Sequence, residues 1–140
     1  VITAWVPAQP IPLEMGPLSF AYPLDVYKLV KAVKFEKAST GYDCGVSDVF
    51  LKNNVSVNET PFELGEVSFH HNLNFHTASS NRTNRSRVAL ANTYYRDGAR
   101  VVNAPTMVSG DWQKFMPNVK PGDIAVSPLN PICWPIKDKS

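Results

Sequence analysis

Short runs in which apolar and polar residues alternate follow one another along this chain, and prolines or glycines separate most of them. A two-residue period is typical of strands that bury one face. It predicts strands over residues 1–8, 18–22, 66–71, 73–78 and 86–95, with a turn at Met15 and Gly16. With 12 prolines and 7 glycines among 140 residues, short strands and many turns are favoured over long helices.

The period changes in the middle of the chain, over residues 25–61. Apolar residues recur there at positions that share one face of an α-helix: Val26, Leu29, Val30 and Val33. Asp25 is a suitable N-cap for this helix. A loop is expected over 39–45, and a second short helix over 47–52. We therefore interpret 25–61 as a helical insertion or a lid.

The rest of the chain is irregular after residue 96, with one helical turn expected over 111–115 and a last strand over 124–127. Taken together, the predicted elements are mainly β with minor helices, which suggests half of a jelly roll or barrel. A length of 140 residues fits a single domain, 1–140. Half a barrel would expose sheet edges and an apolar face, so we expect self-association or pairing with a missing half.

Composition excludes several classes of protein. Fourteen basic and twelve acidic residues give a net charge of +2, too weak a bias to indicate a nucleic-acid partner. No run of about 18 apolar residues exists, so no membrane partner is expected. The two cysteines, Cys44 and Cys133, are not spaced as a metal knuckle or a redox pair and are interpreted as reduced thiols. A cytoplasmic protein is the expectation.

Candidate chemistry lies on the later strands. His70 and His71 point to opposite faces of their strand, so at most one of them can share a site with His76. Arg87 shares a face with two alanines, which leaves room around its guanidinium for a carboxylate ligand; a solvated outer face explains the pattern equally well. We expect the strands over 66–71, 75–78 and 86–95 to be antiparallel neighbours, with His76 and Arg87 facing one cavity.

One sequence motif resembles the C-terminal half of the phytanoyl-CoA dioxygenase family. It consists of residues 65–71 (GEVSFHH), 75–78 (FHTA), Asn81 and Arg87. In that family an Asn follows five residues after the distal iron-binding His, and an Arg follows eleven residues after it, as Asn81 and Arg87 follow His76. Residues 1–5 (VITAW) and 14–18 (EMGPL) are also similar to the family. The resemblance implies a double-stranded β-helix, a jelly-roll or cupin-like core that is incomplete here.

The resemblance also implies a function. Members are non-haem oxygenases that use Fe(II) and 2-oxoglutarate to hydroxylate a small molecule, whose identity this chain does not reveal. His76 would be an iron ligand and Arg87 the partner of the distal carboxylate of 2-oxoglutarate, because a guanidinium meets a carboxylate with two hydrogen bonds. Trp5 matches a position that lines the co-substrate pocket, and Asn81 orders the turn after the metal-binding strand.

Two departures from the family pattern limit this interpretation. Ala78 replaces a Ser that donates to the co-substrate, and the His-x-Asp motif that supplies the other two iron ligands is absent. The chain alone is therefore expected to be inactive and to bind iron poorly, unless a missing N-terminal segment supplies that motif. The alternative is a non-catalytic jelly-roll module, or degenerate family member, in which Arg87 binds a carboxylate without iron. A His-x-Asp in the reading frame within roughly twenty residues upstream of Val1 would support the enzyme, and an initiator Met without that motif would support the module.

Overall fold

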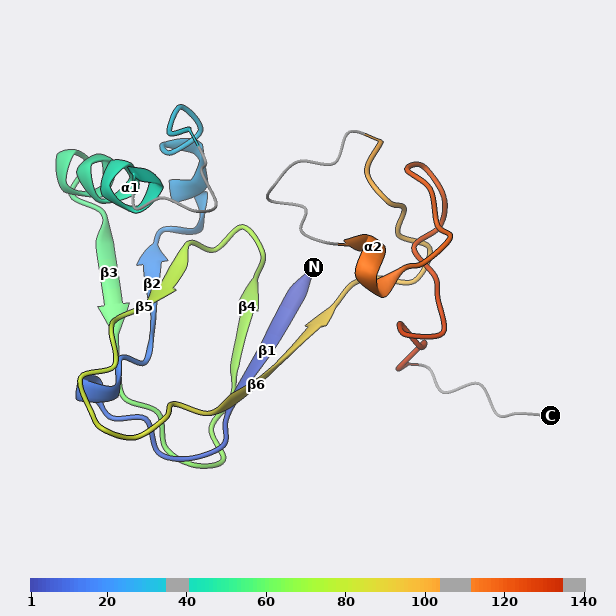
Figure 1. Cartoon of the computed structure of the whole chain (residues 1–140). Coiled ribbons are helices and arrows are strands. Elements are labelled where there is room, and N and C mark those ends of the chain that lie inside the picture. Colours follow the sequence, from blue (N-terminus) through green and yellow to red (C-terminus); the bar gives the residue numbers. More distant parts are fainter. Residues whose placement is uncertain (35–40, 104–111, 135–140) are drawn as a thin grey trace. The chain divides into compact units, whose positions relative to one another are not determined.

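A computed structural model describes residues 1–34, 41–103 and 112–134. The chain divides into two compact units, Val1–Tyr94 and Tyr95–Ser140. The first unit holds two three-stranded sheets, and the described residues include few helices (Figure 1). The mainly β class predicted from the sequence is confirmed.

The first sheet has β1 (Ile2–Pro7) at its centre, with β4 (Ser68–His71) on one side and β6 (Ala89–Tyr94) on the other. Both pairings are antiparallel, and Thr3 lies opposite His70 and opposite Thr93. Residues directly opposite each other share a face of the sheet. One face of this sheet therefore carries Thr3, Trp5, His70, Ala91 and Thr93.

The second sheet has β2 (Leu18–Tyr22) at its centre, between β3 (Ser56–Glu59) and β5 (His76–Ala78). Both pairings are again antiparallel, and Phe20 lies opposite His76 and Asn58. The expectation that the strands over 66–71, 75–78 and 86–95 are neighbours is wrong. β5 belongs to the second sheet, and β1 lies between β4 and β6.

The core of the first unit is formed mainly by the first thirty residues. Fully buried side chains include Ile11 and Met15, at 0% and 2% exposure. Ile11 precedes a tight turn, and Met15 lies within it. The turn is made by the 3₁₀ helix η1 (Leu13–Met15) and Gly16, whose φ of 68° lies in the left-handed region. The turn predicted at Met15 and Gly16 is confirmed. Glycine suits this position because it adopts a positive φ without steric cost.

The segment between β2 and β3 differs from its prediction. A 3₁₀ helix, η2 (Leu24–Lys28), and turns replace the α-helix expected from residue 25, and the residue that caps η2 is Pro23 rather than Asp25. The α-helix α1 (Gly41–Lys52) begins six residues earlier than expected, so residues 41–45 are helical and not a loop. Residues 39–40 of the expected loop lie outside the described part of the chain.

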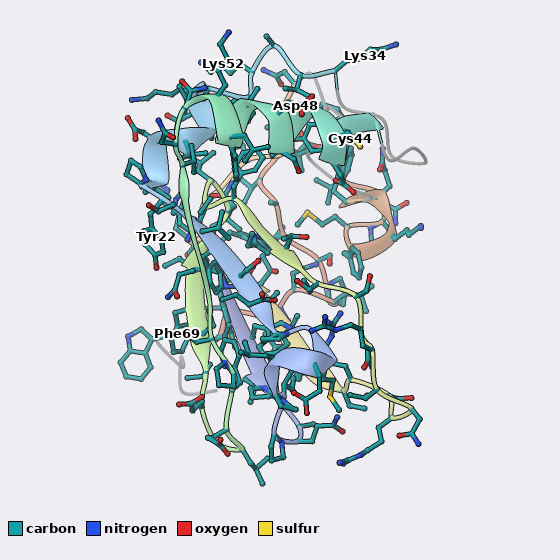
Figure 2. All side chains as sticks on the ribbon, turned by 90° about the vertical axis from the view of Figure 1, so that its left-hand side faces the viewer. Tyr22, Lys34, Cys44, Asp48, Lys52 and Phe69 are labelled. Carbon is teal, nitrogen blue, oxygen red and sulfur yellow. The ribbon has the colours of Figure 1, made fainter. Side chains whose placement is uncertain are left out.

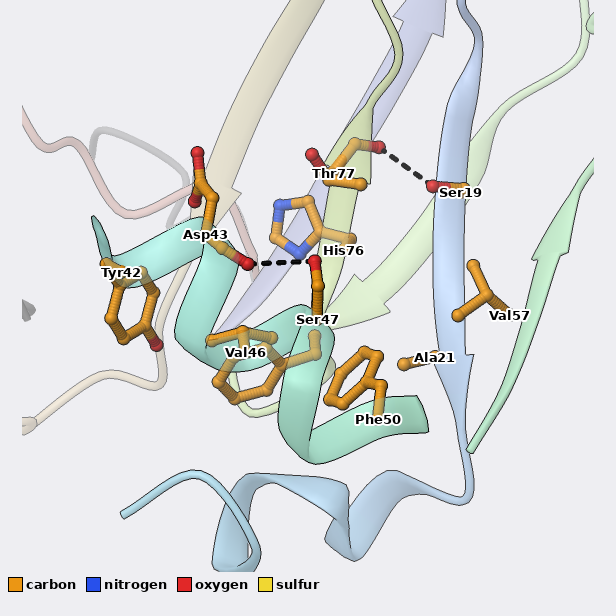
Figure 3. A pocket seen from close by; sticks show the side chains of 11 residues that line it. Ser19, Ala21, Tyr42, Asp43, Val46, Ser47, Phe50, Val57, His76 and Thr77 are labelled. Atoms are coloured by element: carbon orange, nitrogen blue, oxygen red, sulfur yellow. Dashed lines mark hydrogen bonds between the residues drawn. The ribbon is translucent and has the colours of Figure 1, made fainter. Parts of the chain in front are cut away.

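Helix α1 has an inner and an outer side. Cys44, Asp48 and Lys52 are spaced one turn apart, are exposed and lie on its outward side (Figure 2). Val46 and Phe50 lie on the side that faces β2 and β5 (Figure 3). The helix therefore covers the face of the second sheet that carries Ser19, Ala21 and Thr77.

The second unit is largely irregular. It contains the short helix α2 (Trp112–Phe115), which agrees with the helical turn expected there, although Asp111 lies outside the described residues. The strand expected over 124–127 is reduced to isolated bridges, Arg100 with Ile124 and Ser127 with Asn130. No helix in the described part of the chain is long and apolar enough to cross a membrane.

Candidate functional site

Two histidines meet between the two sheets. His70 from β4 and His76 from β5 have ring centroids 4.6 Å apart, although they come from different sheets. Phe20 from β2 lies beside both, with centroids 5.2 Å from His70 and 6.0 Å from His76. The three rings therefore join the facing surfaces of the two sheets, with His70 buried and His76 exposed.

The hydrogen bonds of His76 determine which of its nitrogens is available. Its Nδ1 lies 2.9 Å from the backbone carbonyl of Asn74. A carbonyl oxygen can only accept, so Nδ1 carries the proton and donates it. In the neutral ring Nε2 then keeps its lone pair, and this is the usual arrangement of a metal-binding histidine with a supporting carbonyl.

His70 is held in a different environment. At 6% exposure it is the more buried of the two, and its Nδ1 lies 3.2 Å from the Ser68 hydroxyl. Burial lowers the pKa of His70 from its ordinary value, and the neighbouring His76 lowers this pKa further, because two imidazolium charges would repel. His70 is therefore favoured as a neutral ring at physiological pH.

The register of β1 and β4 settles which histidine joins His76. His70 lies opposite Thr3 on the inner face, whereas His71 lies opposite Ile2 on the outer face and is exposed. Strand alternation alone could not choose between His70 and His71. It places the two side chains on opposite faces but does not show which face is the inner one. Phe20 was not singled out from the sequence, since its contacts join strands that are distant along the chain.

Arg87, just before β6 begins, joins two backbone segments through three carbonyl groups. Its Nη1 donates to the carbonyls of Met15 and Ser79, each at 3.2 Å, and also to the carbonyl of Gly16. These three hydrogen bonds all use one nitrogen, so Nε and Nη2 can still serve an incoming anion. The side chain is half-buried rather than fully solvated.

His76 is the first residue of β5, and Arg87 contacts the backbone just beyond the other end of this strand. Ser79, whose carbonyl accepts from Arg87, comes three residues after His76, which is about 10 Å along an extended chain. Arg87 and Ala91 are four residues apart, so strand alternation would put both on one face. Ala91 shares its face of the sheet with Trp5 and His70. The positions of both residues are thus compatible with a ligand lying along β5.

Trp5 and Asn81 have defined structural contacts. Trp5 lies on the inner face of β1 and packs edge-on against Phe62, with ring centroids 5.0 Å apart. Asn81 donates from Nδ2 to the carbonyl of Arg85 at 2.7 Å, and its Oδ1 accepts from Thr83 N at 2.9 Å and Thr83 Oγ1 at 2.7 Å. Asn81 therefore orders the turn that leads from β5 to Arg87.

The residues of this site do not fit a complete iron centre. A facial-triad iron site needs two imidazoles and one carboxylate. Within residues 1–34, 41–103 and 112–134, no group of three or more His, Cys, Asp or Glu side chains is placed to hold a metal ion. His70 and His76 offer two imidazoles at most, so a carboxylate would have to come from elsewhere.

Comparison of the chain with models of known protein families, with curated proteins and with solved structures finds no significant match.

Proposed function

We propose that the first unit belongs to the C-terminal part of a double-stranded β-helix from a non-haem Fe(II) and 2-oxoglutarate-dependent oxygenase, as the resemblance to the phytanoyl-CoA dioxygenase family implies. In this proposal His76 is one iron ligand and Arg87 binds the distal carboxylate of 2-oxoglutarate. The observation that carries it is the placement of His76, with Nε2 available, on the strand that leads to the anchored Arg87.

The strand order supports the proposed fold. Of the five connections between successive strands, four cross from one sheet to the other, and only the β2 to β3 connection stays within a sheet. Double-sheet jelly rolls are built from such crossing connections. Within the described residues β5 and β6 each pair with one neighbour, so each sheet has a free edge beside the strands that carry or follow the site.

These free edges indicate where the missing ligands would enter. A strand added beside β5 would lie about 4.8 Å from it, which brings its side chains within reach of His76. A His-x-Asp motif on such a strand would place both ligands on one face, because alternate residues share a face. We infer that a segment carrying this motif, outside residues 1–140, completes the iron site.

The alternative function is a non-catalytic module that binds a carboxylate through Arg87 alone. It is favoured because, within the described residues, no carboxylate joins His70 and His76 in a group of three placed to hold a metal ion. In this case His76 is a structural histidine and metal has no influence on ligand binding. The two functions therefore differ in whether 2-oxoglutarate and a divalent metal bind cooperatively.

Calorimetric titration of 2-oxoglutarate into the chain tests the site at Arg87. We expect weak binding, with a Kd of roughly 6–80 mM, because a bidentate contact contributes about 1.5–3 kcal/mol and chelation by a metal is missing. Arg87→Lys should weaken binding about tenfold although it keeps the charge, since an ammonium cannot form two parallel hydrogen bonds.

Arg85→Lys is the matched control, because Arg85 is exposed in the preceding turn. Melting curves of both variants establish that they remain folded. Equal affinity in the wild type and both variants would remove the co-substrate assignment of Arg87.

A further inference from the structure

A pocket of about 350 Å³ lies within the first unit, between α1 and the second sheet (Figure 3). Its volume lies near the lower end of the range for small-molecule sites in proteins. The helix contributes Tyr42, Val46 and Phe50 among others, and the sheet contributes residues of β2, β3 and β5. The first residue of β5, His76, also lines this pocket.

One end of the pocket is apolar. Val46 and Phe50 from α1 face Ala21 of β2 and Val57 of β3 (Figure 3). Phe75 adds a second ring, edge-on to Phe50 with centroids 6.0 Å apart. An aromatic or short aliphatic body can bury its surface against these walls without leaving a polar group unpaired.

The other end of the pocket is rich in hydrogen-bond acceptors. Asp43, Ser47 and His76 lie near one another there (Figure 3). The Ser47 hydroxyl donates to the Asp43 carbonyl at 2.8 Å, so its oxygen keeps free lone pairs. Among the described residues that line the pocket, Asp43 is the acidic one.

The charge of Asp43 acts on its neighbour Tyr42, which also lines the pocket. Burial raises the pKa of Tyr42, and the negative charge of Asp43 raises this pKa further. A carboxylate placed at this end would meet the same repulsion, whereas an ammonium would pair with Asp43 and donate to the neighbouring oxygens. The pocket and Arg87 therefore select ligands of opposite charge.

We propose that this pocket binds a small organic amine, with its apolar body against Phe50 and Phe75 and its protonated nitrogen at Asp43. Binding requires no metal and no 2-oxoglutarate. The identification of such an amine as the substrate class rests on the proposed function, because His76 lines the pocket and is also the proposed iron ligand.

The test is an NMR titration of the ¹⁵N-labelled chain with 2-phenylethylamine, 2-phenylethanol and phenylacetate, which share a body and differ in head group. We expect the amine to shift signals from α1, β2 and β5, and to bind at least tenfold more tightly than phenylacetate. Asp43→Asn should remove the preference for the amine over the alcohol. Asp48→Asn, on the outward side of α1, should keep this preference.

Val46→Trp should fill the pocket and abolish binding of all three compounds, provided that the spectrum shows a folded chain. Equal affinity for the amine and phenylacetate, or an unchanged preference in Asp43→Asn, would overturn the proposal. Arg87→Lys should leave amine binding unchanged, and Asp43→Asn should leave 2-oxoglutarate binding unchanged. Amine binding without 2-oxoglutarate binding would support the pocket while contradicting the proposed function; the reverse result would overturn the pocket alone.

Discussion

The contact between Gly16 and Ser79 joins the first turn of the chain to the end of β5. A Cβ on Gly16 would lie 2.1 Å from the Ser79 carbonyl oxygen and 3.1 Å from Arg87 Nη1. Neither the backbone oxygen nor the anchored guanidinium can move away without losing hydrogen bonds. The glycine therefore allows the close approach that lets Arg87 bridge Met15 and Ser79.

Replacing this glycine should destabilise the first unit strongly. Gly16→Ala adds the cost of a positive φ and a clash with backbone, so we expect a loss of about 2 kcal/mol or more in the free energy of unfolding. Gly65→Ala is the control, because Gly65 has a φ of 94° and a Cβ added there would meet no atom within 4 Å. Urea denaturation measures both variants, and equal losses would contradict the role assigned to the Ser79 contact.

His70 should make stability depend on pH. Its folded pKa is lowered, so between that value and the unfolded pKa of about 6.5 the unfolded chain binds more protons. The stabilisation is therefore complete above about pH 7 and declines as the pH falls from about 6.5 through the lowered pKa. Urea midpoints between about pH 7.5 and 5.5 should fall in the wild type and in His71→Gln, but less in His70→Gln. Equal slopes in all three proteins would exclude His70 as the source.

At the scale of elements, the sequence predicts the strands better than the helices. β1, β2, β4, β5 and β6 lie where alternation placed them. β3 was missed because Ser56–Glu59 is short and holds a single apolar residue, Val57. The valines of the expected helix at residue 25 do contribute to the core, with Val26 and Val30 buried. A 3₁₀ helix followed by turns also buries residues at this spacing. The hydrophobic pattern alone therefore does not distinguish it from an α-helix.

The early start of α1 has a tertiary cause. Gly45 suggested a loop, because glycine is unfavourable inside helices. A Cβ at Gly45 would lie 2.8 Å from Val33 Cγ1, so the helix needs glycine there to pack against the turn after η2. Local propensity cannot reveal such a contact between segments, and the loop prediction was wrong for this reason.

The outer face of the first sheet should drive self-association. It carries Ile2, Phe69, Leu90 and Tyr94, which are 49%, 69%, 58% and 45% exposed, beside the free edge of β6 (Figure 2 labels Phe69). Leu90→Lys should shift sedimentation profiles toward the monomer. Leu51→Lys on α1, where Leu51 is 78% exposed, should not. A wild-type chain that stays monomeric at all concentrations would contradict this expectation.

At the scale of the whole molecule, the sequence predicted the order of the candidate site residues along the chain but not the pairing of the strands around them. His76 lies on β5, Asn81 lies in the following turn, and Arg87 lies just before β6. This is the order that the sequence motif predicts. The strand pairing was wrong because the chain crosses between sheets after β4 and again after β5. Pairing across sheets depends on contacts between distant segments, and alternation within a strand carries no information about it.

The central claim is that His76 and Arg87 belong to one site that a divalent metal and 2-oxoglutarate share. It is tested most directly by NMR of the ¹⁵N-histidine-labelled chain with Mn²⁺, a paramagnetic substitute for Fe(II). Without a third ligand the metal should bind weakly, and broadening should affect His76 and the adjacent His70 before His71 on the outer face.

Adding 2-oxoglutarate should reduce the Mn²⁺ concentration needed to broaden His76, because the co-substrate chelates the metal and is held by Arg87. Arg87→Lys should remove this enhancement, while Arg85→Lys should retain it. Broadening of His71 equal to that of His76, or broadening of His76 that 2-oxoglutarate does not change, would contradict a shared site and favour the non-catalytic module.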